Sequence, residues 1–284
     1  NWRRATRWIR TAPRGPGPRP RLAITGSSGA LGRVLATALG DTYRLRLIDR
    51  AAPDPAVAAA GEVVMADLSD AAAARAALDG MDMVVHLAGQ PLEAPWEEIL
   101  SANIVTTYNV FEAARLAGVR RFVFGSSHHV VGFHRRDRVV GTEAPVRPDT
   151  RYAVSKVFGE ALGRLYADKH GLSVVCQRIG VARPRPPHER ALWTWQSEGD
   201  YVRFTRCCLA APDIHFLVVY GVSRNTRRLW DTAAERIGYE PRDDAEDHLD
   251  EIRATSGPEP ALERLFHGGS FCAQEFAGDP DRID

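Results

Sequence analysis

The stretch Arg21-Leu-Ala-Ile-Thr-Gly26-Ser-Ser-Gly29-Ala-Leu-Gly32 decides the fold of this chain. A short apolar run enters three regularly spaced glycines, and helical periodicity follows from Ala30 to Leu39, where Gly40 ends it. A strand that passes through a glycine loop into a helix is the setting in which such a loop binds the phosphates of a dinucleotide. A glycine triplet without this setting would indicate only a turn.

Each glycine of the loop has a predicted role. Gly26 permits the tight turn out of the strand, Gly29 lets backbone amides approach a pyrophosphate, and Gly32 lets the helix pack close to the sheet. Ser28 and Leu31 lie between these glycines and are expected to contact the same ligand. The spacing G-x-x-G-x-x-G departs from the G-x-G-x-x-G of many dinucleotide sites, so the loop alone is a weak signal.

Strands and helices alternate through most of the chain. Further strands are predicted at 43–48, 62–65, 82–87, 121–124 and 172–179, and helices at 70–79, 95–117 and 150–170. Such alternation predicts an α/β fold of the Rossmann type, a doubly wound parallel sheet covered on both faces. Beyond residue 182 the alternation breaks, and we expect helical stretches within 189–210, a strand at 215–220, and helices near 227–237 and 242–254.

These patterns predict four regions. Residues 1–20 carry six arginines and no acid and are expected to be a disordered basic leader. Residues 21–181 are expected to form the dinucleotide-binding core, which includes the long helix at 150–170, and residues 182–256 are expected to form a small ligand-binding region interleaved with the last strand. Residues 257–284, rich in glycine and proline, are expected to pack as an irregular tail.

Asp49 bears on the choice of dinucleotide. It lies at the end of the second predicted strand, seventeen residues beyond Gly32, where a carboxylate accepts hydrogen bonds from the adenosine ribose and repels a 2′-phosphate. The sequence therefore favours NAD over NADP, although the neighbouring Arg50 could accommodate the phosphate. Asp67 follows the third strand, where it would either reach the adenine or cap the next helix.

Tyr152-Ala-Val-Ser-Lys156 indicates the chemistry. Positions i and i+4 are neighbours on one helix face, so the ammonium of Lys156 can favour the phenolate of Tyr152, while a hydroxyl of the Ser126-Ser127 pair from a neighbouring strand can bind the same substrate oxygen. Such a group is a base for alcohol oxidation. The other interpretation is an ordinary surface pair, but lysine occurs only at 156 and 169 in a chain with 35 arginines, which favours a specific role.

Composition excludes several classes of function. A net charge of +1 provides no overall field for nucleic acid or anionic lipid. The four cysteines, at 176, 207, 208 and 272, have no metal-ligand spacing, the histidines are scattered, and no metal site is expected. No apolar run approaches the ~20 residues that cross a bilayer. We expect a cytoplasmic enzyme without nucleic-acid or membrane partners.

These motifs resemble the extended short-chain dehydrogenase/reductase family of the NAD-dependent epimerase/dehydratase superfamily, and within it most closely the branch of the uronate dehydrogenases. The resemblance extends over nearly all of the chain from residue 21 and includes His86-Leu-Ala-Gly89, Pro148 to Glu160, Arg178-Ile-Gly180 and Val218-Val-Tyr-Gly-Val222. It implies NAD-dependent oxidation of a sugar acid at the anomeric carbon to an aldarolactone. It also implies a homo-oligomer paired through the helices around 95–117 and 150–170.

The resemblance assigns roles to individual residues. Tyr152 is the base, Lys156 lowers its pKa and binds the nicotinamide ribose, and Ser127 orients the reacting hydroxyl. Arg190 grips the substrate carboxylate, which suits the bidentate fork of a guanidinium. His128 and His129 are further candidate substrate contacts. The remaining cofactor contacts are Leu68, Leu87, Ala88, Gly89 and Asn103.

Three departures from the branch concern substrate contacts. The chain has Pro91, His128 and Val181 where uronate dehydrogenases have Ser, Asn and Ser. The loss of hydroxyl-pairing groups predicts either weaker uronate binding or a different, less hydroxylated acid. Two other functions stay open: an epimerase or dehydratase that retains its NAD, and a catalytically silent dinucleotide-binding protein.

Overall fold

The computed structural model describes residues 18–284, so the predicted leader lies almost entirely outside the described residues. Its centre is a seven-stranded parallel sheet with the order β3-β2-β1-β4-β5-β6-β9. The strands are β1 (Arg21–Thr25), β2 (Arg44–Asp49), β3 (Glu62–Met65), β4 (Met83–His86), β5 (Arg121–Ser127), β6 (Ser173–Ile179) and β9 (Phe216–Gly221). The predicted α/β Rossmann-type fold is confirmed. The strand order reverses between β1 and β4, and a doubly wound sheet binds its ligand at the carboxyl ends of such strands.

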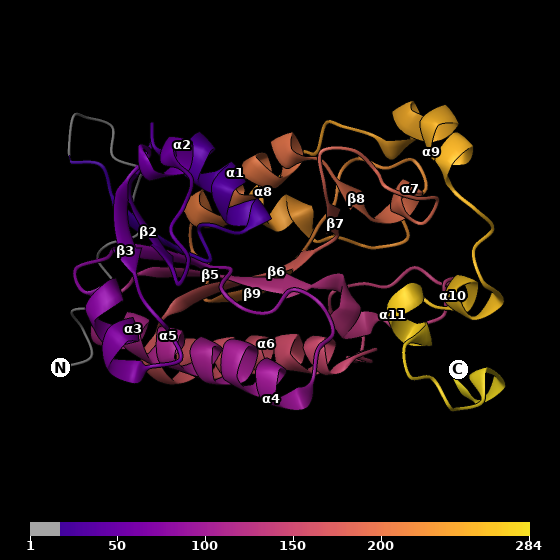
Figure 1. The fold of residues 1–284 in the computed structure, drawn as a ribbon, viewed down its shortest axis with the longest axis horizontal. Coiled ribbons are helices and arrows are strands. Elements are labelled where there is room, and N and C mark those ends of the chain that lie inside the picture. Colours follow the sequence, from indigo (N-terminus) through magenta and orange to yellow (C-terminus); the bar gives the residue numbers. More distant parts are fainter. Residues whose placement is uncertain (1–17) are drawn as a thin grey trace.

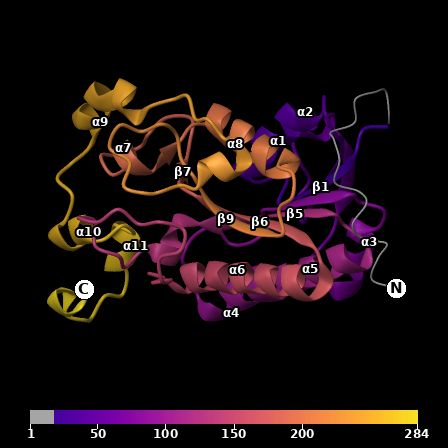
Figure 2. The ribbon, with the colours of Figure 1, turned by 180° about the vertical axis from the view of Figure 1, so that it is seen from behind.

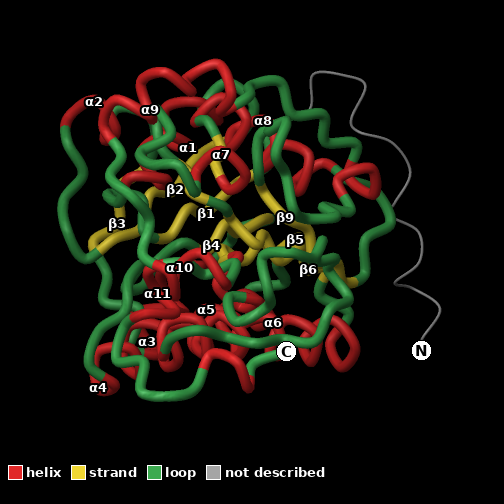
Figure 3. Tube along the Cα trace, turned by 90° about the vertical axis from the view of Figure 1, so that its right-hand side faces the viewer, coloured by secondary structure: helices red, strands yellow, loops and turns green. Residues whose placement is uncertain are grey.

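Helices cover both faces of the sheet (Figures 1 and 3). One face carries α1 (Ala30–Leu39), α2 (Pro55–Ala58) and α8 (Glu198–Ala210), and the other carries α3 (Ala71–Leu78), α5 (Thr106–Leu116) and α6 (Arg151–His170). The short α4 (Trp96–Ile99) and a π-helical segment, Leu100–Val105, lead into α5 without a break. The expected helix at 95–117 is therefore continuous in space, but it changes from α-helical to π-helical and back to α-helical along its length.

The sequence explains where α6, the helix that carries Tyr152 and Lys156, begins and ends. Thr150 precedes α6, and its hydroxyl accepts a hydrogen bond from the Ala153 N–H at 3.1 Å. Gly171 ends the helix in the left-handed conformation, with φ of 71°. The first turn of α6, with Tyr152, therefore lies at the carboxyl end of β5.

Two apolar layers hold the helices to the sheet. The helices α1 and α8 bury residues such as Leu35 and Phe204 against one face. On the other face Phe111 of α5 stacks on Phe122 of β5 with ring centroids 4.0 Å apart. Every residue of β5 is buried, as expected for a parallel strand covered on both sides.

The C-terminal third differs from the expectation in two places. The expected helix near 227–237 is mostly extended chain: Trp230 forms a β-bridge with Val140, and only a 3₁₀ turn, Ala234–Ile237, is helical. A second small parallel sheet pairs β7 (Val181–Ala182) with β8 (Trp195–Gln196). The other helices of this region are α7 (Ala191–Thr194), the 3₁₀ turn Ala245–His248 and α9 (Leu249–Thr255).

The segment expected to be an irregular tail has its own structure. It contains α10 (Ala261–Leu265), α11 (Ser270–Ala273) and a 3₁₀ turn, Pro280–Arg282, and Figure 2 shows α10 and α11 at one end of the sheet. The chain from 265 to 268 runs antiparallel to 132–136, with His267 N–H donating to His134 O at 3.0 Å. Arg136 clamps this segment through two 2.7 Å hydrogen bonds to the Glu259 carboxylate. The tail is therefore tied to the loop that follows β5.

Among residues 18–284, no helix combines the length and apolar character that crossing a membrane requires.

Candidate active site

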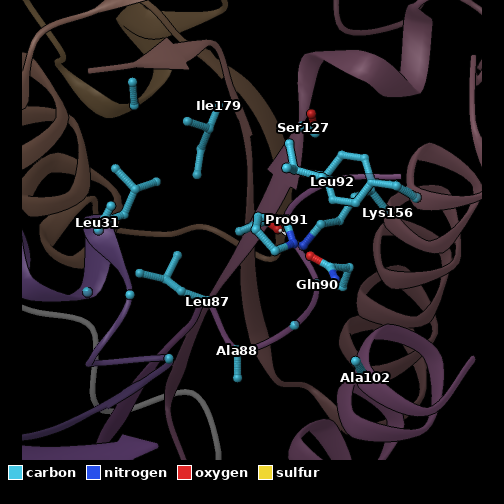
Figure 4. A pocket seen from close by; sticks show the side chains of 18 of the residues that line it. Leu31, Leu87, Ala88, Gln90, Pro91, Leu92, Ala102, Ser127, Lys156 and Ile179 are labelled. Carbon is cyan, nitrogen blue, oxygen red and sulfur yellow. Dashed lines mark hydrogen bonds between the residues drawn. The ribbon is translucent and has the colours of Figure 1, made fainter. Parts of the chain in front are cut away.

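A cleft of about 890 Å³ opens at the carboxyl ends of β1, β4 and β5. Figure 4 shows the apolar side chains of Leu31, Leu87 and Ile179 on one side of it and Ser127 and Lys156 on the other. Its volume lies in the upper part of the range for small-molecule sites. Nearly every residue expected to bind cofactor or substrate lines it, namely Gly26, Ser28, Gly29, Leu31, Gly32, Asp49, Asp67, Leu68, Leu87, Ala88, Gly89, Ser127, His128, His129, Tyr152, Lys156 and Arg190.

The glycine loop packs closely against its neighbours because no side chain fits at Gly26 or at Gly32. Gly26 has φ of 72°, and a Cβ there would lie 2.7 Å from the Ala88 backbone nitrogen. A Cβ at Gly32 would lie 2.2 Å from the Gly26 carbonyl oxygen, so α1 can approach the loop only with glycine at this position. Gly29 begins α1 without a side-chain cap, which leaves first-turn amides facing the cleft. Helix N-termini of this kind bind phosphate.

The carboxylate of Asp49 fixes the shape of the loop. Its Oδ2 accepts from the Ser28 N–H at 2.9 Å and its Oδ1 from the Ala51 N–H at 3.1 Å. Arg50 lines the same part of the cleft. Asp67 accepts from the backbone and hydroxyl of Ser69, which lowers its pKa, whereas Asp70 caps α3. Asp67 is thus not the helix cap and lies at the cleft wall.

A buried polar chain holds the turn after β4. The Thr25 hydroxyl oxygen accepts from the backbone N–H groups of Leu87 and Ala88, both at 3.2 Å. It lies 2.7 Å from His86 Nδ1, and His86 Nε2 lies 3.2 Å from the Thr107 hydroxyl. Burial lowers the pKa of His86 to about 3, so the imidazole is neutral. This chain fixes Leu87 and Ala88 at the centre of the cleft.

Asn103 is the exception among the predicted cofactor contacts. It is absent from the cleft wall and supports it from behind: Oδ1 accepts from the Gln90 N–H at 2.7 Å, and Nδ2 donates to Gln90 O and to the Ser155 hydroxyl. A Cβ at Gly89 would lie 2.7 Å from Oδ1. Asn103 therefore positions the Gly89–Gln90 turn against α6.

Ser127, Tyr152 and Lys156 meet at the middle of the cleft. The Lys156 ammonium donates to the Gly125 carbonyl at 2.8 Å and lies 5.5 Å from the centre of the Tyr152 ring. Glu93 accepts from the Tyr152 N–H at 2.8 Å and fixes the first turn of α6. Burial raises the pKa of Tyr152 to about 12, an effect that the Ser127 hydroxyl opposes, and burial lowers the pKa of Lys156 to about 8.

Arg190 lies at the far end of the cleft and is buried. One guanidinium nitrogen, Nη1, donates to the His267 carbonyl at 2.9 Å and lies 3.4 Å from His128 Nε2. Within residues 18–284, Nε and Nη2 have no hydrogen-bond partner. A Cβ at Gly269 would lie 2.6 Å from Arg190 Cδ, so the side chain crosses over that glycine. Burial lowers the pKa of Arg190 to about 10, and the group remains a cation at neutral pH.

His128 supports Arg190. Its Nδ1 lies 3.0 Å from the Ile179 carbonyl, so Nδ1 carries the proton and Nε2 can accept from Arg190. Burial and the neighbouring cations hold its pKa well below the usual range. Both ring nitrogens therefore have hydrogen-bond partners within the protein. This favours a structural role for the buried His128 over direct contact with a substrate hydroxyl. Pro91 and Val181, the other departures from the uronate branch, line the cleft.

The model of the NAD dependent epimerase/dehydratase family matches residues 22–182, the part of the chain that forms the cleft from the glycine loop to β7. The chain belongs to this family. Within the family, several relatives resemble it over nearly their full length.

A uronate dehydrogenase of Pseudomonas syringae pv. tomato is 39% identical over 267 residues, which cover 92% of this chain and 96% of the relative. A solved uronate dehydrogenase of Agrobacterium tumefaciens, a variant with one tyrosine replaced by alanine and complexed with NAD, has a TM-score of 0.86 at 39% identity, covering 90% of this chain and 97% of that one. An NAD-dependent glucose-6-phosphate dehydrogenase of Haloferax volcanii is 40% identical and covers 78% of this chain and 93% of its own length.

Three residues at the substrate end of this family member escaped the sequence analysis. Phe271 lines the cleft and stacks on His129, Asp149 bonds His129 from behind, and the His267 carbonyl holds Arg190. The paired glycines at 268 and 269 were the sequence feature that could have pointed to this region. In the structure each of them lies close against other side chains, where a larger residue would not fit. Among the described residues, no group of His, Cys, Asp and Glu is arranged to hold a metal ion.

Proposed function

We propose that this chain is an NAD-dependent dehydrogenase that oxidises a uronate-like sugar acid at the anomeric carbon to an aldarolactone. The observation that carries the proposal is one cleft in which a buried arginine lies beyond a buried Tyr–Lys pair. Arg190 offers Nε and Nη2 to a carboxylate, and Tyr152 lines the same cleft as Arg190 and the dinucleotide loop. Relatives named uronate dehydrogenases at 38–41% identity support the same substrate class.

The geometry of the glycine loop fits NAD. First-turn amides of α1 would hold the pyrophosphate, and Asp49 lies where the adenosine ribose would be held. Lys156, which lines the cleft beside Tyr152, would bind the nicotinamide ribose. The oxidised nicotinamide ring, when bound, supplies the hydride acceptor.

The residues of the chain carry out the proton transfer. Ser127 and Tyr152 bind the anomeric hydroxyl, and Tyr152 takes its proton as the hydride leaves the carbon. Burial, with the negative charge of Asp149, raises the pKa of Tyr152 to about 12, so formation of the phenolate requires nearby positive charge. The ammonium of Lys156 is the cation on the same helix face that favours it. Arg190 fixes the sugar acid, which places the anomeric carbon beside Tyr152.

Release of NADH tests the proposal. Purified protein is given NAD with glucuronate, galacturonate, glucose 6-phosphate or arabinose, and NADH absorbance is followed. We expect net NADH with the uronates and a higher kcat/KM for them than for the neutral or phosphorylated sugars. Product formation without net NADH would instead identify an NAD-retaining epimerase or dehydratase, and NAD binding without turnover would identify a silent binding protein.

We also propose that copies of the chain pair through the face formed by α5 and α6. Large apolar side chains on this face are about half exposed, among them Tyr108, Leu116, Val154 and Leu165. Exposed apolar patches on helices commonly form subunit interfaces. Light scattering after size exclusion should give more than one chain per particle, and the double variant Tyr108→Arg with Leu165→Glu should be monomeric.

A further inference from the structure

His129 and Asp149 form a buried pair at the substrate end of the cleft that the reaction above does not use. His129 Nδ1 lies 2.6 Å from Asp149 Oδ2. The carboxylate of Asp149 is completely inaccessible to solvent, whereas His129 lines the cleft. The pair therefore has one inner member and one member that a substrate can reach.

The imidazole of His129 has a fixed orientation. Phe271 stacks on one face with ring centroids 3.9 Å apart, and His128 lies 4.1 Å away. The ring of Tyr152 meets it edge to face at 6.3 Å. The backbone N–H of His129 donates to the Ser127 hydroxyl oxygen at 3.2 Å. His129 is thus held directly beside the two residues that bind the reacting hydroxyl.

Asp149 occupies a socket built for a carboxylate. A Cβ at Gly132 or at Gly268 would lie 2.0 Å from its Oδ2, so both glycines are required for it to fit. Its Oδ1 accepts from the Thr150 hydroxyl at 3.0 Å, and the same hydroxyl caps α6. A buried carboxylate is costly unless it is paired, and His129 is its nearest partner.

The pair determines which nitrogen of His129 carries the proton. An ionised carboxylate only accepts hydrogen bonds, so Nδ1 facing it must be the donor, and Nε2 keeps its lone pair. Within residues 18–284, Nε2 of His129 has no hydrogen-bond partner. We infer that Asp149 is a positioning residue that holds the proton of His129 on Nδ1, so that the bare Nε2 accepts a hydrogen bond from a hydroxyl of the sugar acid in the cleft. This inference rests on the proposed function.

Uptake of one further proton would reverse the role of His129. The proton goes either to the imidazole or to Asp149, which then donates to Nδ1; in both cases Nε2 becomes a donor. Burial raises the pKa of Asp149 to about 7. The groups that face the pair are His128, Tyr152, Arg190 and Cys272, and the cation of Arg190 opposes protonation of either member. The acceptor form therefore prevails above neutral pH and is lost as the pH falls.

The first experiment compares pH profiles of kcat/KM for glucuronate in the wild type, Asp149→Asn and Asp149→Leu. In Asp149→Asn the Thr150 hydroxyl selects the amide oxygen, so the amide N–H₂ faces Nδ1 and forces the proton of His129 onto Nε2. Asp149→Leu removes the acceptor altogether. We expect both variants to lose about ten- to a hundredfold in kcat/KM near pH 8, mainly through KM, with NAD affinity unchanged.

The matched control is Asp200→Asn. Asp200 is another fully buried carboxylate, but it binds the backbone at 242–243 and the Ser223 hydroxyl, away from the cleft. This variant loses stability as well, and its kcat/KM and pH profile should remain those of the wild type. An equal loss in Asp200→Asn would mean that general destabilisation explains the effect.

The second experiment reads the tautomer directly and needs no turnover. Proton–nitrogen correlation spectra of histidine side chains, with His129 assigned through His129→Gln, should show protonated Nδ1 in the wild type near pH 8 and protonated Nε2 in the Asp149 variants. The inference is overturned if Nδ1 keeps its proton in both variants. It is also overturned if the tautomer changes while kcat/KM does not. Failure of the proposed function would appear separately, as absence of NADH release from every uronate by the wild type.

Discussion

The two ends of the cleft are built in different ways. The dinucleotide end consists of backbone and small residues, and its Gly26 lies close to both Gly32 and the Leu87–Ala88 turn. The opposite end consists of charged and aromatic side chains from segments far apart in the chain, among them the buried Arg190 and the half-buried Phe271. Under the proposed function, the first end recognises the cofactor by shape, and the second selects the substrate through its charged and aromatic side chains. Substitutions at the dinucleotide end should therefore alter the KM for the cofactor, and substitutions at the other end should alter kcat/KM for the sugar acid.

The largest effect is expected from Tyr152→Phe. Removal of the base should lower kcat by about 10²–10⁴-fold while the affinity for NAD changes little. Initial rates and calorimetry measure the two quantities. Tyr166→Phe is the matched control, because it removes a hydroxyl from the same helix where it bonds Glu112, outside the cleft. Retention of more than about a tenth of the wild-type rate by Tyr152→Phe would exclude Tyr152 as the base.

Arg190→Lys should have the next largest effect, at the substrate end only. A point charge cannot reproduce a bidentate fork, and we expect kcat/KM for uronates to fall by about ten- to a hundredfold with the affinity for NAD intact. The value of kcat/KM for neutral sugars should fall less. Arg121→Lys is the control, since Arg121 is also buried and donates to the Cys208 and Ala211 carbonyls at the opposite end of β5. Equal losses for neutral and acidic sugars would contradict a carboxylate-binding Arg190.

Gly32→Ala should disrupt the packing of α1 on the glycine loop and weaken NAD binding. The new Cβ would lie 2.2 Å from the Gly26 carbonyl, which forces α1 away from the loop, so the KM for NAD should rise by roughly tenfold and stability should fall by about 1–3 kcal/mol. Gly199→Ala is the control, because its Cβ meets only atoms at 3.5 Å or beyond. Initial rates over a titration with NAD measure the KM, and thermal unfolding measures the stability. An unchanged KM would show that the loop does not need close helix packing.

Asp49→Ser should give the smallest effect. Removing the carboxylate takes away the repulsion of a 2′-phosphate, and the preference for NAD over NADP should narrow by about five- to tenfold through the KM for NADP. Arg50→Ala should widen the same preference. A wild type that uses both cofactors equally would show that Arg50 dominates at this position.

The sequence predicted the dinucleotide end better than the substrate end for a physical reason. The close approach of Gly32 to Gly26 joins residues six positions apart, so the glycine spacing of the loop is visible in the sequence. The socket of Asp149 requires Gly132 and Gly268 to meet, and no periodic pattern marks such a meeting. Asn103 was expected at the cofactor, but the π-helical turn before α5 places it behind the Gly89–Gln90 turn.

The pairing of residues 132–136 with 265–268 has a consequence for the order of assembly during synthesis. All seven strands of the sheet are present once Gly221 has emerged from the ribosome, and chains fold from the N-terminal side as they are made. The clamp between Arg136 and Glu259 joins residues 123 positions apart, and Phe271 follows later still. A nascent chain therefore acquires its dinucleotide loop before the wall that holds Arg190 and His129, and the capacity to bind cofactor precedes the capacity to select a substrate.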